Sequence, residues 1–175
     1  MKKALLQAEV QEFLRAKLNT IAAKIALSKS PFYKVSSSDL AQQLTGLQKA
    51  KGKLPLWFKN PQIYYPKKLN LEQTSSETTA KYKASLVSGE NLIDLTGGFG
   101  IDAYYFAENF KKVIHCEMNP ELSKIAAHNL KELGRNNIIF KEGDSIEFLK
   151  NTAKTFDCIF IDPARRDNTG GKVLN

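Results

Sequence analysis

From residue 91 onward, the hydrophobic and polar positions alternate between two patterns. Short apolar runs with an acidic residue at or beside their end predict strands at 91–95, 113–117, 138–142 and 157–161. Between them, apolar residues at helical spacing predict helices at 101–110, 119–134 and 145–150. Strands that alternate with helices form right-handed βαβ units. The sequence therefore predicts an α/β fold, a partial doubly wound (Rossmann-like) parallel sheet with the strand order 3-2-1-4.

The first 72 residues follow a helical pattern instead. Residues 4–28 carry Leu, Ile, Val and Phe at helical spacing, and residues 19–20 are expected to divide them into two helices. Residues 37–39 (Ser-Ser-Asp) predict the cap of a further helix. Residues 51–73 contain three prolines and aromatic residues that alternate with lysines, which predicts an ordered connector. We expect a small helical N-terminal module with a connector (residues 1–72), followed by the sheet.

The second part, residues 73–175, begins with Thr74-Ser75-Ser76-Glu77, which fits the capping box T-x-x-E and predicts a helix to about Lys83. It contains four strands, whereas a complete sheet of this kind has about six. We therefore expect the sheet to continue beyond this sequence. Strand four would be a bare edge, which favours pairing with another chain and predicts self-association.

Composition narrows the class of protein. The chain is 42% hydrophobic and 25% charged, which is typical of a globular domain. No apolar run approaches the ~20 residues that span a membrane, and the N-terminus has no secretory signal pattern. The two cysteines, Cys116 and Cys158, lie in predicted strands, which suits a reducing compartment. The sequence predicts a cytoplasmic protein without a membrane contact.

The net charge of +8 is unevenly distributed. Residues 1–90 carry 15 Lys and Arg against 6 Asp and Glu, and residues 91–175 carry 11 against 12. A basic half favours a polyanionic partner such as RNA. A solvated basic surface without a partner remains the alternative.

The stretch 91-NLIDLTGGFGIDA-103 carries the strongest chemical signal. It fits both the dinucleotide fingerprint G-x-G-x-x-[GA] and the D-x-x-x-G-x-G of enzymes that bind S-adenosylmethionine (SAM). Gly98 and Gly100 suit either ligand, because glycine lets a ligand lie against bare backbone. Asp94 favours SAM, because a carboxylate there would repel a pyrophosphate. Thr96 and Phe99 complete the candidate cofactor-binding turn.

Acidic residues after the other strands extend this candidate site. Glu117 can accept hydrogen bonds from both ribose hydroxyls of a nucleoside, in either type of cofactor. Asp144, with Ser145, can meet the adenine or cap the following helix, and both roles remain open. Asp162 and Pro163 follow strand four at the topological switch point, where ligands of such sheets bind. They are the candidate catalytic residues, with Asp162 orienting the methyl acceptor.

Together, DLTGGFG, CEMNPE, EGDS and IDPAR resemble motifs I to IV of class I SAM-dependent methyltransferases. The chain is also similar to the N-terminal part of a bacterial family of THUMP-like-domain RNA methyltransferases, which shares LPLWF, YYPKKLNLEQTSSETTAKYKA, NPELSKIAAHNL and IDPARRD. The resemblance implies SAM contacts through the backbone of Gly98 and Gly100, with Asp94 near the methionine end, Glu117 on the ribose and Asp144 near adenine. It also implies a C-terminal continuation with a THUMP-like domain that contacts RNA, without which this chain alone is inactive. Ala164 and Arg165 depart from the D/N-P-P-[YFW] of amino-group methyltransferases, which argues against N-methylation of a base.

Several weaker candidates remain open. The first turn of the helix after Thr74 either holds the SAM carboxylate or only packs. One set of residues either stacks on RNA bases or forms a core between the two parts: Trp57, Phe58, Tyr64, Tyr65, Lys67 and Lys68. Arg165 and Arg166 either contact a phosphate or are solvated. His115 and His128 have no metal-ligand spacing, so no metal is expected.

The sequence thus favours a SAM-dependent methyltransferase that acts on RNA. The alternatives are a nicotinamide-dependent oxidoreductase and a non-catalytic RNA-binding module. Asp94 and Asp162-Pro163 argue against the nicotinamide enzyme.

Overall fold

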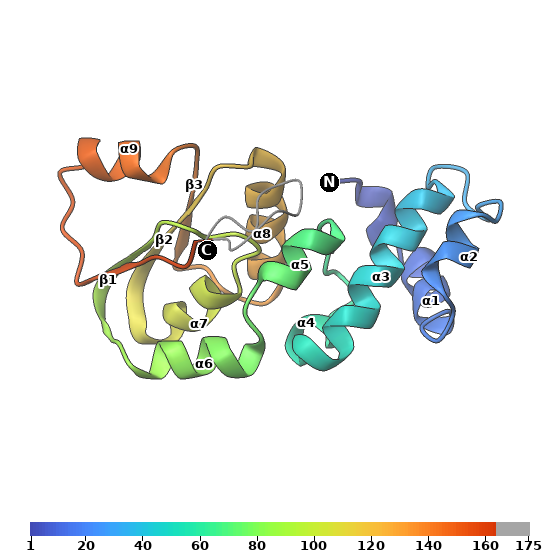
Figure 1. The fold of residues 1–175 in the computed structure, drawn as a ribbon, viewed down its shortest axis with the longest axis horizontal. Helices are drawn as coiled ribbons and strands as arrows, with labels where there is room; N and C mark the ends of the chain where they lie inside the picture. The colour runs from blue at the N-terminus through green and yellow to red at the C-terminus, as the bar shows by residue number, and fades with distance from the viewer. Residues whose placement is uncertain (164–175) are drawn as a thin grey trace, which may run out of the picture.

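A four-stranded parallel sheet forms the centre of the C-terminal part of the computed structural model, which describes residues 1–163 (Figure 1). The sheet contains β1 (Gly89–Asp94), β2 (Phe110–Glu117), β3 (Ile138–Glu142) and β4 (Cys158–Phe160). All neighbouring strands are parallel, and their order is β3-β2-β1-β4. This confirms the predicted fold class and strand order.

The two faces of the sheet are covered unequally. Leu92 and Val113 pack into a large apolar cluster with α7 (Ile101–Asn109) and α8 (Pro120–Glu132), and α6 (Glu77–Ser85) packs on α7. The next residue along each strand, Ile93 or Ile114, points to the opposite face, as alternation along a strand requires. That face is covered by α9 (Ser145–Asn151), through Phe148 and Leu149.

The N-terminal module is helical, as predicted, and lies at one end of an elongated molecule (Figure 1). Its elements are η1 (Lys3–Leu6), α1 (Ala8–Ala16), α2 (Ala22–Ala26), α3 (Ser37–Lys53), α4 (Pro55–Lys59) and α5 (Lys68–Gln73). The predicted break near residues 19–20 is confirmed. The cap of α3 is Ser36 rather than residues 37–39, because its side chain accepts from Asp39 N–H at 3.1 Å.

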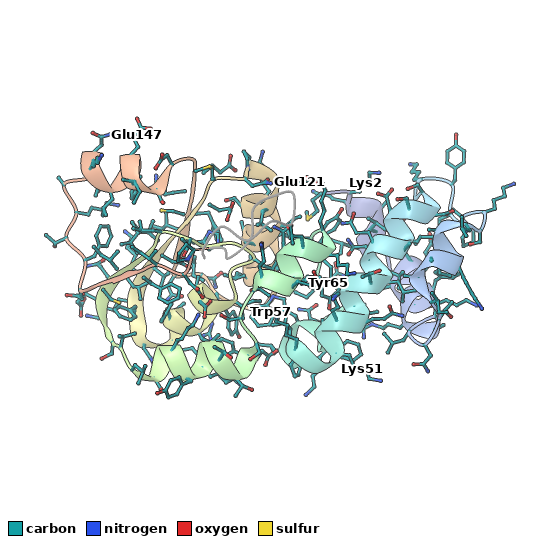
Figure 2. The ribbon with its side chains drawn as sticks, in the orientation of Figure 1. Lys2, Lys51, Trp57, Tyr65, Glu121 and Glu147 are labelled. Atoms are coloured by element: carbon teal, nitrogen blue, oxygen red, sulfur yellow. The ribbon has the colours of Figure 1, made fainter. Side chains whose placement is uncertain are left out.

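Aromatic residues of the connector form a core between the module and the sheet. Trp57, Tyr64 and Tyr65 are buried, and Figure 2 shows Trp57 and Tyr65 in the middle of the molecule. The Trp57 ring packs edge-on against Tyr104, with ring centroids 5.0 Å apart. The Asn129 side chain bonds both backbone polar groups of Tyr64, at 2.9 Å each. The interpretation of these rings as an RNA-stacking surface is therefore wrong, and the core interpretation is confirmed.

The predicted capping box at Thr74–Glu77 does not form. Thr74 already ends α5, so Ser76 caps α6 by accepting from Thr79 N–H at 3.1 Å. Glu77 turns inward and accepts from the backbone N–H of Leu56 and from the Tyr105 hydroxyl. In a capping box the Glu77 carboxylate would accept from the backbone N–H of Thr74. Here it accepts from two residues that are distant in sequence instead. No helix in residues 1–163 is long and apolar enough to cross a membrane.

Candidate functional site

The carboxyl ends of the strands border an open cleft of about 1750 Å³. Seven residues of the predicted site line it: Thr96, Gly98, Phe99, Glu117, Ser145, Asp162 and Pro163. Three others lie next to it without lining it: Asp94, Gly100 and Asp144. The parallel order of the strands brings these segments together, because every carboxyl end lies at the same edge of the sheet.

The glycine turn connects β1 to α7 in a conformation that other residues resist. Gly98 has φ +55° and Gly100 has φ +85°, both in the left-handed region. Gly97 is required for space, since a Cβ there would lie 2.4 Å from Nε2 of His115. The turn exposes backbone along one side of the cleft, while the Phe99 side chain is buried in the core beneath it.

Glu117 is held by backbone at the mouth of the cleft. Its Oε2 accepts from Gly98 N–H at 2.9 Å, and its Oε1 accepts from Asn119 N–H at 2.7 Å. A carboxylate oxygen has two lone pairs, so each oxygen can still accept a hydroxyl proton. The carboxylate is thus oriented for a diol while it also fixes the turn.

Asp94 lies beneath the turn, with only 1% of its surface exposed. Its Oδ1 accepts from Thr96 N–H at 2.9 Å and, more weakly, from the Thr96 hydroxyl at 3.4 Å. Burial raises the pKa of Asp94 to about 7, against the two hydrogen bonds from Thr96, which lower it. Asp94 therefore acts on the cleft through Thr96 and changes its charge near neutral pH.

Asp144 is the N-cap of α9, which confirms one of its two proposed roles. Its Oδ1 accepts from Ile146 N–H at 2.8 Å and from Glu147 N–H at 3.1 Å. The residue is exposed, and its Oδ2 makes neither of these bonds. The cap leaves that oxygen available for a second partner beside Ser145.

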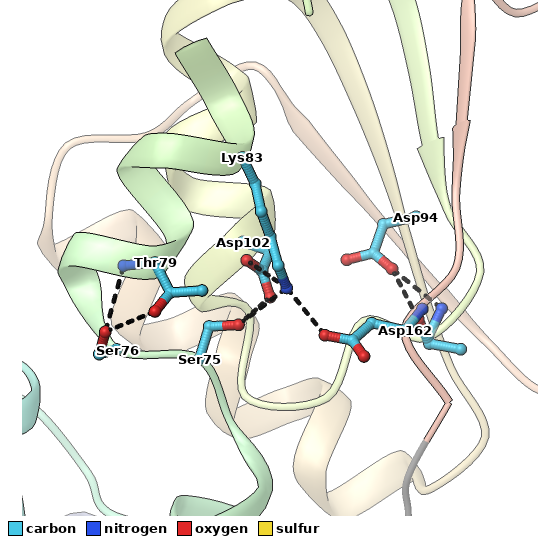
Figure 3. A network of polar contacts seen from close by, with 8 residues as sticks. Ser75, Ser76, Thr79, Lys83, Asp94, Asp102 and Asp162 are labelled. Atoms are coloured by element: carbon cyan, nitrogen blue, oxygen red, sulfur yellow. Dashed lines mark hydrogen bonds and ion pairs between the residues drawn. The ribbon is translucent and has the colours of Figure 1, made fainter. Parts of the chain in front are cut away.

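Asp162 is fixed at the end of β4 by two separate contacts, which Figure 3 shows. Its backbone N–H donates to the Thr96 hydroxyl at 2.7 Å. Its Oδ2 accepts from Nζ of Lys83 at 2.8 Å, while the Asp162 side chain remains 56% exposed. The carboxylate is therefore held in place but stays open to the cleft.

Lys83, Ser75 and Asp102 belong to this site, and the sequence pattern missed all three as site residues. Lys83 Nζ lies 3.0 Å from Ser75 Oγ and 3.3 Å from Asp102 Oδ1 (Figure 3). Burial alone would lower the pKa of Lys83, but the bond to Asp162 and the charge of Asp102 outweigh it and raise that pKa. No local motif predicts a contact between residues that lie 79 positions apart.

The buried imidazole of His115 is structural. Burial lowers the pKa of His115 to about 4, so the ring is neutral at neutral pH, and it packs against Gly97 and the Phe140 ring. Within the described part of the chain, no group of three His, Cys, Asp or Glu residues could hold a metal ion. Cys116 and Cys158 are free thiols. Arg165 and Arg166 lie outside the described residues.

Known proteins resemble this chain in sequence and in fold. Residues 89–167 match a family described as RNA cap guanine-N2 methyltransferase. An uncharacterised RNA methyltransferase of Mycoplasma mobile is 36% identical over 78 residues, which are 44% of this chain and 21% of that protein. A crystal structure described as a candidate methyltransferase of Porphyromonas gingivalis W83 is 30% identical, with a TM-score of 0.75 over 94% of this chain and 42% of that one.

An O-methyltransferase of Bacillus cereus, solved in complex with SAH, shares the fold at 17% identity, with a TM-score of 0.52 over 73% of this chain and 64% of that one. The chain thus spans about a fifth of the Mycoplasma protein and less than half of the Porphyromonas protein. By its sheet order, its cleft and these likenesses, the chain has the Rossmann-like α/β fold of methyltransferases.

Proposed function

We propose that this chain is the cofactor-binding part of a SAM-dependent methyltransferase that acts on RNA. The observation that carries the proposal is the convergence of four separate sequence motifs on one cleft. Its volume of about 1750 Å³ exceeds the roughly 300–1,000 Å³ of most small-molecule sites, which leaves room for a substrate base beside a cofactor.

The residues of the cleft fit SAM in order along the sheet edge. Glu117 would receive the ribose hydroxyls, and the free Oδ2 of Asp144 would receive the adenine amine. Thr96 and the turn would lie at the methionine end, with the partly ionised Asp94 below favouring positive charge. Asp162, held between Thr96 and Lys83, would orient the acceptor. Methyl transfer is an in-line displacement, so a fixed acceptor supplies much of the rate.

The relatives and the charge distribution support RNA as the substrate. Both the matching family and the Mycoplasma relative are described as RNA methyltransferases. The basic half of the chain supplies charge for a polyanion. The family description names guanine N2 as the acceptor, whereas Ala164 and Arg165 argue from the sequence against an amino acceptor. Identification of the methylated base by mass spectrometry, with the full-length protein, decides between them.

We further propose that the complete protein is cytoplasmic and carries the RNA-contacting THUMP-like domain beyond this chain. The greater length of the Porphyromonas protein supports a continuation. Within residues 1–163, β4 pairs with β1 alone, so its outer edge is open to a strand of a second copy. We also propose that the chain divides into residues 1–72 and 73–175, two parts that share one apolar cluster.

Calorimetric titration of the chain with SAM, SAH and NAD tests the cofactor assignment. We expect SAM and SAH to bind and NAD not to bind. Glu117→Gln should weaken SAM binding roughly 10-fold to 100-fold, because it replaces a charged acceptor of hydrogen bonds. Glu132→Gln, an exposed acid at the end of α8, is the matched control and should bind as the wild type does. Tight NAD binding, or a folded chain that binds none of the three, would overturn the assignment.

A further inference from the structure

The loop between α2 and α3, residues 27–36, is held rigidly from the inside. We call it the α2–α3 loop. Phe32 packs edge-on against Phe13, with ring centroids 5.5 Å apart, and Val35 is buried. Ser30 Oγ accepts from Phe32 N–H at 3.1 Å, and the Ser37 hydroxyl donates to Ser28 O. The backbone of the loop therefore has a defined shape, from which the remaining side chains point outward.

Two large side chains of the loop point into solvent. Tyr33 is fully exposed, and Leu27 is 90% exposed. Phe32, before Tyr33, packs on Phe13, and Val35, two residues after it, is buried, whereas the Tyr33 ring lies in solvent.

The surroundings of Tyr33 carry more basic than acidic residues. Between Glu12 and Asp39 the sequence contains five basic residues and no acidic one. Lys29, Lys34 and Tyr33 line a common depression of about 730 Å³. Asp39, the acid at its border, is already paired with Lys2 at 2.6 Å.

The lysines of this region also lack ion-pair partners. Lys24, Lys29 and Lys34 are exposed, and none of them forms an ion pair with a residue of the described chain. By contrast, the exposed Lys111 pairs with Glu90 at 2.7 Å. Positive charge around Tyr33 is therefore free to meet an external polyanion.

We propose that the α2–α3 loop is a docking surface for single-stranded RNA, and this inference rests on the proposed function. The Tyr33 ring stacks on a base, while Lys29 and Lys34 contact the flanking phosphates, the combination that single strands require. An exposed planar ring favours a base over an acidic peptide, which offers charge but no flat surface to stack.

The surface anchors RNA at a distance from the cleft. It lies in the helical module, at the end of the molecule away from the sheet (Figure 1). The α2–α3 loop therefore holds a segment of RNA outside the cleft, and its loss changes RNA affinity without a change in cofactor affinity.

The test is fluorescence anisotropy of a labelled 20-nucleotide RNA of mixed sequence, titrated with the 175-residue chain at several salt concentrations. Tyr33→Ala should weaken binding roughly 5-fold to 100-fold, since stacking contributes about 1–3 kcal/mol per base. The double variant Lys29→Gln/Lys34→Gln should lower the slope of log Kd against log salt by about 1.4, at about 0.7 per phosphate contact in single strands.

Matched controls separate this surface from general effects of charge and ring exposure. Tyr82→Ala removes another exposed tyrosine, and Lys150→Gln/Lys154→Gln removes two exposed lysines at the other end of the molecule. Both should bind RNA as the wild type does. SAM titration and circular dichroism of every variant show whether the cofactor site and the fold are intact.

Four outcomes are distinguishable. Weaker RNA binding by the loop variants alone, with SAM binding unchanged, supports the docking surface. Equal losses in the loop and control variants, or no RNA binding by the wild type, overturn it and leave the cofactor assignment standing. If the wild type does not bind SAM, but the loop variants still weaken RNA binding, the proposed function is overturned and the docking surface is supported. Competition by poly-glutamate as effective as that by unlabelled RNA indicates an acidic protein partner and overturns the RNA assignment.

Discussion

The buried carboxyl of Asp94 predicts that Asp94→Asn changes the stability of the chain in a pH-dependent way. Burial raises the pKa of Asp94 from 3.8 to about 7 in the folded chain. The folded state therefore binds the proton more tightly than the unfolded state, so the free energy of unfolding falls as pH rises from about 4 to about 7. The asparagine variant cannot titrate at this position, so its free energy of unfolding does not fall in this way.

The magnitude follows from the difference between the two pKa values. About 3 pKa units correspond to about 4 kcal/mol when both states are fully ionised. Between pH 5 and pH 8 the same linkage gives about 2–3 kcal/mol. The new amide N–H₂ adds a constant cost of about 1–3 kcal/mol, because it is a buried donor without a partner. Only the change with pH, and not the offset, reports on the Asp94 carboxyl.

Urea unfolding at pH 5, 6, 7 and 8 measures the effect. The stability of Asp94→Asn relative to the wild type should rise by about 2–3 kcal/mol across this range. Asp157→Asn is the matched control. Hydrogen bonds from the backbone N–H groups of Asn91 and Glu90 lower the pKa of Asp157, so its contribution is constant above pH 5. Parallel curves for Asp94→Asn and the wild type would refute the burial argument.

Asp94 also couples protonation to the proposed cofactor. The sulfonium and amino groups of SAM would favour the ionised carboxylate, so SAM should bind more tightly as pH rises from 6 to 8. SAH lacks the sulfonium charge and should show a smaller dependence. Titrations in two buffers of different ionisation enthalpy should detect proton release on SAM binding near pH 7. Equal proton release by Asp94→Asn would contradict this coupling.

Urea unfolding of two further variants tests the contacts that Lys83 and Gly97 make around the site. Lys83→Met should lower the free energy of unfolding by about 1–3 kcal/mol, because it leaves the largely buried Asp102 without a cation, and added Asp102→Asn should restore part of this loss. Gly97→Ala should cost more than about 2 kcal/mol, because its Cβ would lie 2.4 Å from His115. Gly52→Ala, a helical site with nothing within 4 Å, should instead stabilise by about 0.5–1 kcal/mol.

The sheet could be predicted from the sequence because its signals are local. Each strand is a short apolar run with a turn or cap after it, such as Asn119, whose side chain accepts from Glu121 and Leu122 N–H. The strand order is the usual order of doubly wound sheets and does not come from any residue. The position of Glu117 and Asp162 at one edge then followed from parallel pairing alone.

Contacts made across long sequence separations could not be predicted. The T-x-x-E pattern at Thr74 is a valid local signal, but Glu77 finds better partners in the backbone of Leu56 and the hydroxyl of Tyr105. Lys83 gives no motif at all, and its role depends on where β4 ends in space. Side chains with several competing partners are assigned by tertiary packing, which a one-dimensional pattern does not contain.

The two supports of Asp162 differ in what they fix. The bond from its N–H to the Thr96 hydroxyl fixes the backbone after β4, whatever the state of the carboxylate. Lys83 fixes the carboxylate itself, and Asp102 and Ser75 fix Lys83 in turn. Ordering a free acid would cost side-chain entropy when the substrate arrives. In the folded chain Lys83 already orders the Asp162 carboxylate. A methyl acceptor would therefore meet a carboxylate that is oriented and still 56% exposed.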